Sequence, residues 1–180
     1  MKKRIIIAIV LAIVIVGSVF IFTGNNKNCN TNALEFKKEY EKYNNSLVKI
    51  SISDDNPMVK MNKNNIIKKI DSSSGILFFG NPKNNNSRTL IKELLKVAKD
   101  YDCEIIYYYD INDLKNNDVY TELETKLADK SLENNIVIFY KKGEITKYQE
   151  YVKDEKELNK NLVEGFDSIS GGMCEVAKQC

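Results

Sequence analysis

The sequence predicts an α/β fold, a three-layer α/β/α sandwich with a central mixed sheet, preceded by one N-terminal transmembrane helix. Strand-like and helix-like segments alternate from residue 58 onward, which is typical of parallel strands joined by right-handed crossovers. The strand segments 75–80 and 104–111 are largely apolar, as in sheets covered by helices on both faces. The dipeptide Lys142-Gly143 between two further strand segments indicates a hairpin, which adds antiparallel strands at one edge.

The first part of the domain carries shorter signals. Phe36, Tyr40 and Tyr43 recur at helical spacing and predict a short helix. The alternating segment 46–53 predicts a strand, and the turn residues at 54–57 separate it from the next strand segment.

Beyond the turn, segments with period-two or continuous apolar character alternate with segments whose apolar residues recur every three or four positions. The predicted order is strand 58–61, helix 63–73, strand 75–80, helix 87–101, strand 104–111, helix 118–130, a two-stranded hairpin over 135–151, and helix 154–169.

The N-terminal segment predicts a membrane anchor. Eighteen uncharged, mostly apolar residues, 5–22, follow three cations, and as a helix they span about 27 Å, close to the hydrocarbon thickness of a bilayer. The leading cations favour a cytoplasmic N-terminus, so we expect a single-pass protein of the cell membrane whose domain is extracytoplasmic. A cleaved signal peptide and a lipid-modified Cys29 are the alternatives, but no clear cleavage site follows residue 22, and Cys29 follows polar residues.

These signals divide the chain into four parts. The predicted division is an anchor at 1–24, a polar tether at 25–33, a domain at 34–169 and a C-terminal tail with a cysteine pair at 170–180.

Composition excludes several function classes. The sequence contains no histidine, which removes Ser–His and Cys–His catalysis and mixed Cys/His zinc sites. The formal net charge is +2, and without the three cations at residues 2–4 the remaining 24 basic and 25 acidic residues nearly balance. Such a balance does not indicate a nucleic-acid surface. We expect no cofactor, no metal site and no nucleic-acid partner.

The segment "FFGNPKNNNSR" at 78–88 leads from a buried strand into a helix. Together with the order of elements over 36–169, it resembles the thioredoxin fold. More narrowly, it resembles the membrane-anchored, thioredoxin-like proteins of Gram-positive bacteria, including bacteriocin transport accessory proteins. Their loop reads Phe-Gly-x-Pro, one residue, and then Cys-x-x-Cys-Arg. The residues here that keep this frame are Phe79, Gly80, Pro82 and Arg88.

The resemblance implies an active-site loop whose reactive groups are absent. Asn84 and Ser87 stand where the family has its two cysteines, and Asn135 stands where it has a cis-proline. Neither an amide nor an unactivated hydroxyl can replace a thiolate in disulfide exchange. We expect a trans peptide bond before Asn135, and we expect Asn86 and Ser87 to cap the helix. The candidate binding residues are Asn81, Pro82, Lys83, Asn84, Asn85, Asn86, Ser87 and Asn135.

Four cysteines remain, and none lies in this loop. Cys103 opens a strand segment and is expected to be a buried, inert thiol. Cys29 lies in the tether, where it is either free or part of an intermolecular bridge. Cys174 and Cys180 follow two glycines near the chain end and form a local disulfide, a redox pair, or mixed or unpaired thiols.

The function predicted from these features is a membrane-tethered extracytoplasmic module without thiol–disulfide catalysis. It would contact the membrane through residues 5–22 and bind a peptide or protein as an accessory factor, as the resemblance to bacteriocin transport accessory proteins implies. The alternative is a thiol–disulfide oxidoreductase that uses Cys174 and Cys180. A purely structural or immunity role is the third interpretation.

Overall fold

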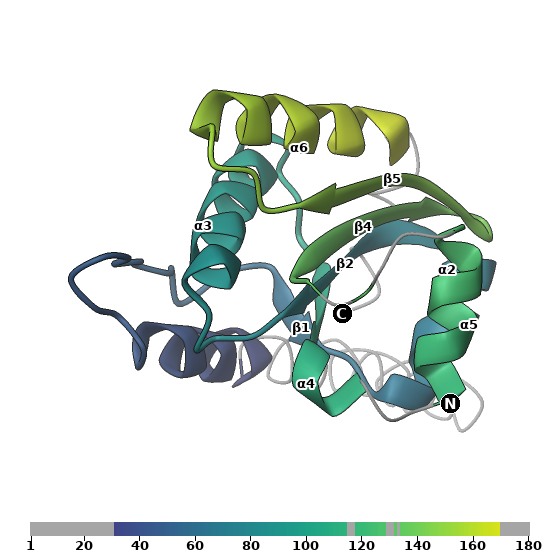
Figure 1. Ribbon diagram of the computed structural model, residues 1–180, viewed down its shortest axis with the longest axis horizontal. Helices are drawn as coiled ribbons and strands as arrows, with labels where there is room; N and C mark the ends of the chain where they lie inside the picture. Colours follow the sequence, from purple (N-terminus) through teal and green to yellow (C-terminus); the bar gives the residue numbers. More distant parts are fainter. Residues whose placement is uncertain (1–30, 115–117, 129–131, 133, 170–180) are drawn as a thin grey trace, which may run out of the picture.

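The structure is a computed structural model that describes residues 31–114, 118–128, 132 and 134–169. These residues form a mixed α/β domain in which a five-stranded sheet lies between two layers of helices (Figure 1). The predicted anchor, most of the tether and the C-terminal tail lie outside the described residues. Within the described residues, no helix combines the length and the apolar character needed to cross a membrane.

The sheet is mixed, as the sequence predicted. Its strands are β1 (Met58–Lys60), β2 (Ser74–Gly80), β3 (Ile106–Asp110), β4 (Ile136–Lys141) and β5 (Glu144–Glu150). They lie in the order β1-β3-β2-β4-β5, with β1, β3 and β2 parallel, β4 antiparallel to β2, and β5 antiparallel to β4. Lys142 and Gly143 both have positive φ, which a tight two-residue hairpin turn requires.

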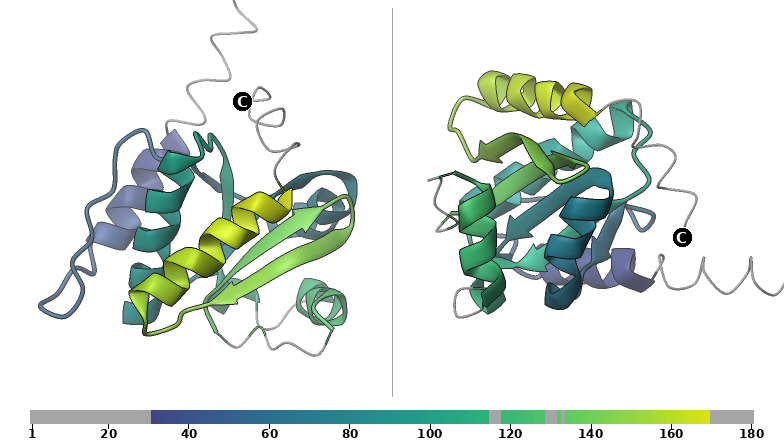
Figure 2. Two further views of the ribbon diagram at one scale, coloured as in Figure 1. Left: turned by 90° about the horizontal axis from the view of Figure 1, so that it is seen from above. Right: turned by 90° about the vertical axis from the view of Figure 1, so that its right-hand side faces the viewer.

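Helices cover both faces of this sheet. They comprise residues 31–41, the 3-10 helix η1 (Lys63–Asn65), α2 (Ile66–Ser72), α3 (Asn85–Asp100), α4 (Ile111–Leu114), α5 (Asp118–Lys126) and α6 (Glu155–Ile169). Helix 31–41, α3 and α6 pack on one face, and α2, α4 and α5 pack on the other (Figures 1 and 2). The predicted alternation of strands and helices from residue 58 onward is confirmed.

The continuous apolar run of β2 is explained by these two layers. Side chains alternate between the faces of a strand, so Ile76 and Phe78 enter one core and Leu77 and Phe79 enter the other. All seven residues of β2 are buried.

The segment 46–53 does not form the predicted strand; it belongs to an irregular loop between helix 31–41 and β1. Ile50 and Ile52 alternate inward as the pattern indicated, and both are buried. Their backbone N–H groups, however, donate to side chains rather than to a neighbouring strand. Ile50 donates to Asn44 Oδ1 at 2.8 Å and Ile52 to Glu41 Oε1 at 2.7 Å.

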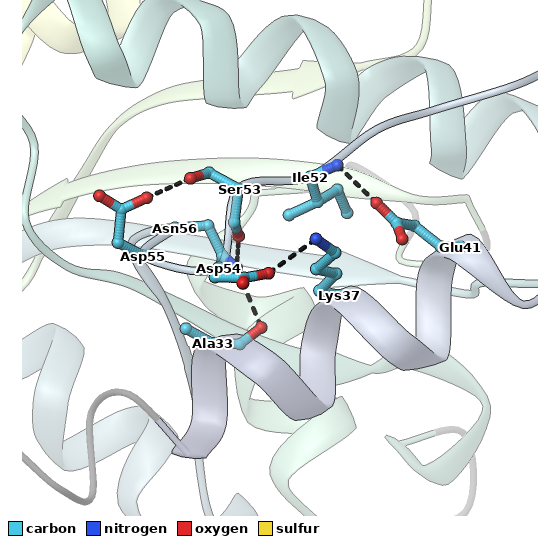
Figure 3. Close-up of polar contacts among 8 residues, drawn as sticks. All are labelled: Ala33, Lys37, Glu41, Ile52, Ser53, Asp54, Asp55 and Asn56. Atoms are coloured by element: carbon cyan, nitrogen blue, oxygen red, sulfur yellow. Dashed lines mark hydrogen bonds and ion pairs between the residues drawn. The ribbon is translucent and has the colours of Figure 1, made fainter.

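Polar contacts fasten the end of this loop to helix 31–41 (Figure 3). The buried Asn56 amide donates to the carbonyl oxygens of Ala33, at 2.9 Å, and Ser53, at 2.8 Å. Lys37 forms an ion pair with Asp54 at 2.7 Å. The helix is therefore held beside the sheet by the loop that succeeds it, and it forms one wall of the candidate site.

Candidate functional site

Side chains of the loop after β2 form hydrogen bonds with backbone groups of the same loop and of the start of α3. Asn84 has extended backbone angles and is the N-cap of α3; its Oδ1 accepts from the N–H groups of Asn86, at 2.8 Å, and Ser87, at 3.2 Å. The prediction that Asn86 and Ser87 cap this helix is therefore wrong. The cap is Asn84, whose amide oxygen satisfies two N–H groups that lack intrahelical partners.

Ser87 faces the core and not the solvent. Its side chain is fully buried, and its Oγ accepts the backbone N–H of Asn81 at 2.9 Å. The Tyr40 hydroxyl of helix 31–41 lies 3.4 Å from the same Oγ. A group buried in this way holds the loop in place and is not presented to a substrate.

Asn135, directly before β4, contacts the same loop. The preceding peptide bond is trans, as expected, because no described peptide bond is cis. Asn135 is buried, and its Oδ1 accepts the backbone N–H of Asn81 at 2.9 Å. The N–H of Asn81 is thus shared between Asn135 and Ser87, which joins the start of β4 to the loop after β2.

Arg88, in the first turn of α3, also forms hydrogen bonds with the loop. It is only 1% exposed, and its guanidinium donates to the Pro82 carbonyl oxygen at 2.8 Å and to Asn85 Oδ1. Its Nε has no hydrogen-bond partner, and no carboxylate in the described part of the chain forms an ion pair with it. The buried cation is therefore compensated by neutral oxygens of the loop, whose shape depends on it.

The exposed surface of the loop consists of Lys83, Asn84 and Asn86, with Asn81 and Asn85 partly exposed. Asn81 Oδ1 also accepts the N–H of Lys83 at 2.9 Å. The loop therefore presents amides and one ammonium on a fixed backbone. Such groups can recognise a ligand by hydrogen bonds, but none of them is a nucleophile or a general base near neutral pH.

Among the four cysteines, only Cys103 lies within the described residues. The expectation of a buried thiol in the strand is wrong: Cys103 is partly exposed and lies in the turn before β3, with its Sγ 3.5 Å from the Ile105 carbonyl oxygen. Ser87 lies in the first turn of α3 and Cys103 follows the end of this helix, and a helix of 16 residues is about 24 Å long. Cys103 is therefore far from the loop. Cys29, Cys174 and Cys180 lie outside the described residues.

A hollow of about 450 Å³ adjoins the loop. Its walls come from the loop, from helix 31–41 with the turn after it, and from the segment after β3. The lining residues are Lys38, Glu39, Lys42, Tyr43, Asn81, Pro82, Lys83, Asp110 and Asn112. Asn81, Pro82 and Lys83 are among the binding residues predicted from the sequence, whereas the carboxylates of Glu39 and Asp110 are not. The position of Asp110 at the carboxyl end of a predicted parallel strand was the signal that could have pointed to it.

Two larger hollows, of about 610 and 530 Å³, lie at the opposite end of α3, beside the loop that contains Asn56 and Pro57. Cys103 lines both of them. No described group of three or more cysteine, aspartate or glutamate side chains is arranged to hold a metal ion there or elsewhere in the described residues. The loop after β2 and its adjoining hollow are therefore the better candidate for function.

No known protein family matches the sequence, and no curated protein matches it either. The function of the site is therefore inferred from its residues and their geometry.

Proposed function

We propose that the protein is a membrane-tethered, thioredoxin-like module that binds a peptide or protein partner outside the membrane without thiol–disulfide catalysis. The strand order β1-β3-β2-β4-β5 and the strand directions are consistent with a thioredoxin-like fold. Residues 5–22 supply the anchor in this proposal, which places the domain on the extracytoplasmic side.

The observation that carries this proposal is the shared hydrogen bond at Asn81. Ser87 and Asn135, which replace a cysteine and the cis-proline of the resembled family, direct their oxygens at one backbone N–H. These two replacements therefore stabilise the loop and leave no reactive group at its centre. A rigid loop without a nucleophile is suited to recognition, because little conformational entropy is lost when a partner binds it.

The surroundings of Ser87 also argue against hydrolytic chemistry. A serine hydroxyl attacks only when a neighbouring base takes its proton, and the sequence has no histidine. The hydroxyl of Tyr40 lies 3.4 Å from the Ser87 Oγ, and burial raises the pKa of Tyr40 far above its ordinary value. Tyr40 is therefore neutral at physiological pH and cannot act as the base.

As an accessory factor of a Gram-positive bacterium, the module would hold its partner near the membrane, for instance during bacteriocin transport. Site-specific photo-crosslinking in intact membranes tests the binding surface. A photoreactive residue at the exposed position of Lys83 is expected to capture a discrete partner. The same residue at the exposed position of Lys156 on α6, remote from the loop, is expected to capture none.

Equal capture from both positions would contradict the assignment of the loop as the binding surface. An insulin-reduction assay addresses the alternative function. Turnover by the purified full-length protein that disappears on Cys174→Ser would show that Cys174 and Cys180 act as an oxidoreductase pair, and the non-catalytic proposal would be wrong.

A further inference from the structure

The hollow beside the loop lies at a special point of the sheet. The strands β2 and β3 are neighbours and run parallel. The helix that follows β2, α3, covers one face of the sheet, whereas α4, which follows β3, packs on the other face. Where the connections of two parallel strands leave to opposite faces, a crevice opens outside their carboxyl ends, and ligands of α/β proteins bind there. Residues directly after both strands line the hollow.

The partly buried charges of this hollow are two carboxylates, and Lys60 attracts one of them, Glu39, without forming an ion pair with it. Glu39 and Asp110 are both partly buried, and neither forms an ion pair within the described part of the chain. Among the described residues, the Asp110 carboxylate accepts hydrogen bonds from the backbone and side chain of Asn112, both at 2.9 Å. Partial burial of a carboxylate without a cation costs free energy that a bound cation would offset.

A buried tyrosine lies beside these carboxylates. Tyr108 is 1% exposed, and its hydroxyl interacts with the Glu39 carboxylate and lowers the pKa of Glu39. Tyr108 lies two residues before Asp110, and therefore on the same face of β3. The charges of Glu39 and Asp110 reach Tyr108, since both add to the increase in its pKa that burial causes. Tyr108 does not itself line the hollow, so the acidic groups that a ligand there would meet are the two carboxylates.

We infer that this hollow takes one positively charged side chain, a lysine or an arginine, of the partner peptide, bound between Glu39 and Asp110. The inference rests on the proposed function, because it names the residue of the partner that the site recognises. The mouth of the hollow carries the exposed lysines Lys38, Lys42 and Lys83. Their ammonium groups favour acidic residues on either side of the bound lysine or arginine and repel a uniformly basic peptide.

Selection from a random library of N-acetylated, C-amidated heptapeptides on the full-length protein tests the inference. Selected peptides are expected to carry lysine or arginine at one fixed position, with aspartate or glutamate beside it. Replacement of that residue by norleucine, which keeps the length and removes the charge, is expected to weaken binding at least about tenfold. The double variant Glu39→Gln, Asp110→Asn should bind the lysine and norleucine peptides equally well.

The matched control is the double variant Glu144→Gln, Asp118→Asn, which neutralises two exposed carboxylates of β5 and α5 and should keep the full preference for lysine. Peptides that bind without a preference for a cation would overturn the inference and leave the proposed function standing. A library that yields no binding peptide would overturn both. Circular dichroism of each variant verifies that its fold is intact, and Asp110→Asn retains the oxygen that accepts from Asn112.

Discussion

The Oδ1 of Asn135 lies 2.9 Å from the backbone nitrogen of Asn81, although the two residues are 54 positions apart in the sequence. This hydrogen bond joins the start of β4 to the loop after β2. The N–H of Asn81 is shared with Ser87 Oγ, so side chains from two distant segments hold the same point of the loop.

Truncation of Asn135 should therefore destabilise the domain. We expect Asn135→Ala to lower the free energy of unfolding by about 1–2 kcal/mol, because the N–H of Asn81 loses one of its two acceptors at a partly buried position. Urea denaturation of the full-length protein measures the change. Asn134→Ala, at the exposed neighbouring position, is the control and should change stability by less than about 0.5 kcal/mol. Equal losses in both variants would show that the contact with Asn81 is not the cause.

The three consecutive asparagines at the start of α3 are not equivalent. Asn84→Ala should cost about 1 kcal/mol, because two N–H groups of the first turn lose their acceptor. Asn84→Asp should restore stability, since a carboxylate accepts the same hydrogen bonds and is favoured at a helix N-terminus. Denaturant unfolding compares these variants with Asn86→Ala, which should be nearly neutral. A larger loss for Asn86→Ala than for Asn84→Ala would contradict the observed cap.

These asparagines also show how far the sequence can be interpreted. The apolar run of β2 and the helical spacing in α3 identify the two elements, because burial requires apolar residues at regular positions in the sequence. No such pattern marks the residue at which α3 starts. Any of three adjacent polar residues can be an N-cap, and a shift of two positions decides whether Ser87 faces the solvent or the core.

The loop before β1 illustrates a second limit. Alternating apolar residues report which side chains are buried, and Ile50 and Ile52 are indeed buried. The pattern does not report what the backbone bonds to, and here the acceptors are the side chains of Asn44 and Glu41. The hollow could not be predicted for a related reason. Glu39 and Asp110 line it together because helix 31–41 packs beside β3, and no local sequence pattern encodes this packing.

Gly80, at the end of β2, is needed because there is no room for a larger side chain at this position. A Cβ at this position would collide with the Phe78 ring and the Tyr40 hydroxyl. Both side chains are fully buried in the core beneath the loop and have little room to move. We expect Gly80→Ala to lower the free energy of unfolding by about 1–3 kcal/mol.

Thermal or urea unfolding of Gly80→Ala measures this loss. The double variant Gly80→Ala, Tyr40→Phe provides the control, because it removes the hydroxyl that the new methyl group meets. Part of the stability should then return. If the loss is the same with and without the Tyr40 hydroxyl, the collision with Tyr40 is not what makes glycine necessary.

Stability should depend on pH with opposite signs at two glutamates. Burial raises the pKa of Glu39; attraction to Lys60 opposes this shift and repulsion from Asp110 adds to it. Its contribution to stability is therefore fully present below the ordinary pKa of glutamate and is lost as the pH rises through the raised pKa. Glu39→Gln mimics the protonated form, so the variant should match the wild type at acidic pH and be the more stable protein at neutral pH.

Glu164 provides the comparison with the reverse sign. Its hydrogen bond and ion pair with Lys147, 2.6 Å away, lower the pKa of Glu164, so its contribution is present above the ordinary pKa and is lost as the pH falls through the lowered value. Glu164→Gln should thus be slightly less stable than the wild type at neutral pH and equal to it in strong acid. Melting temperatures recorded from about pH 3 to about pH 8 measure both differences. With rising pH, Glu39→Gln should gain stability relative to the wild type, whereas Glu164→Gln should lose it. Both substitutions remove one negative charge, so a general effect of net charge would change both variants in the same direction. A change in the same direction for both variants would therefore contradict the assignment.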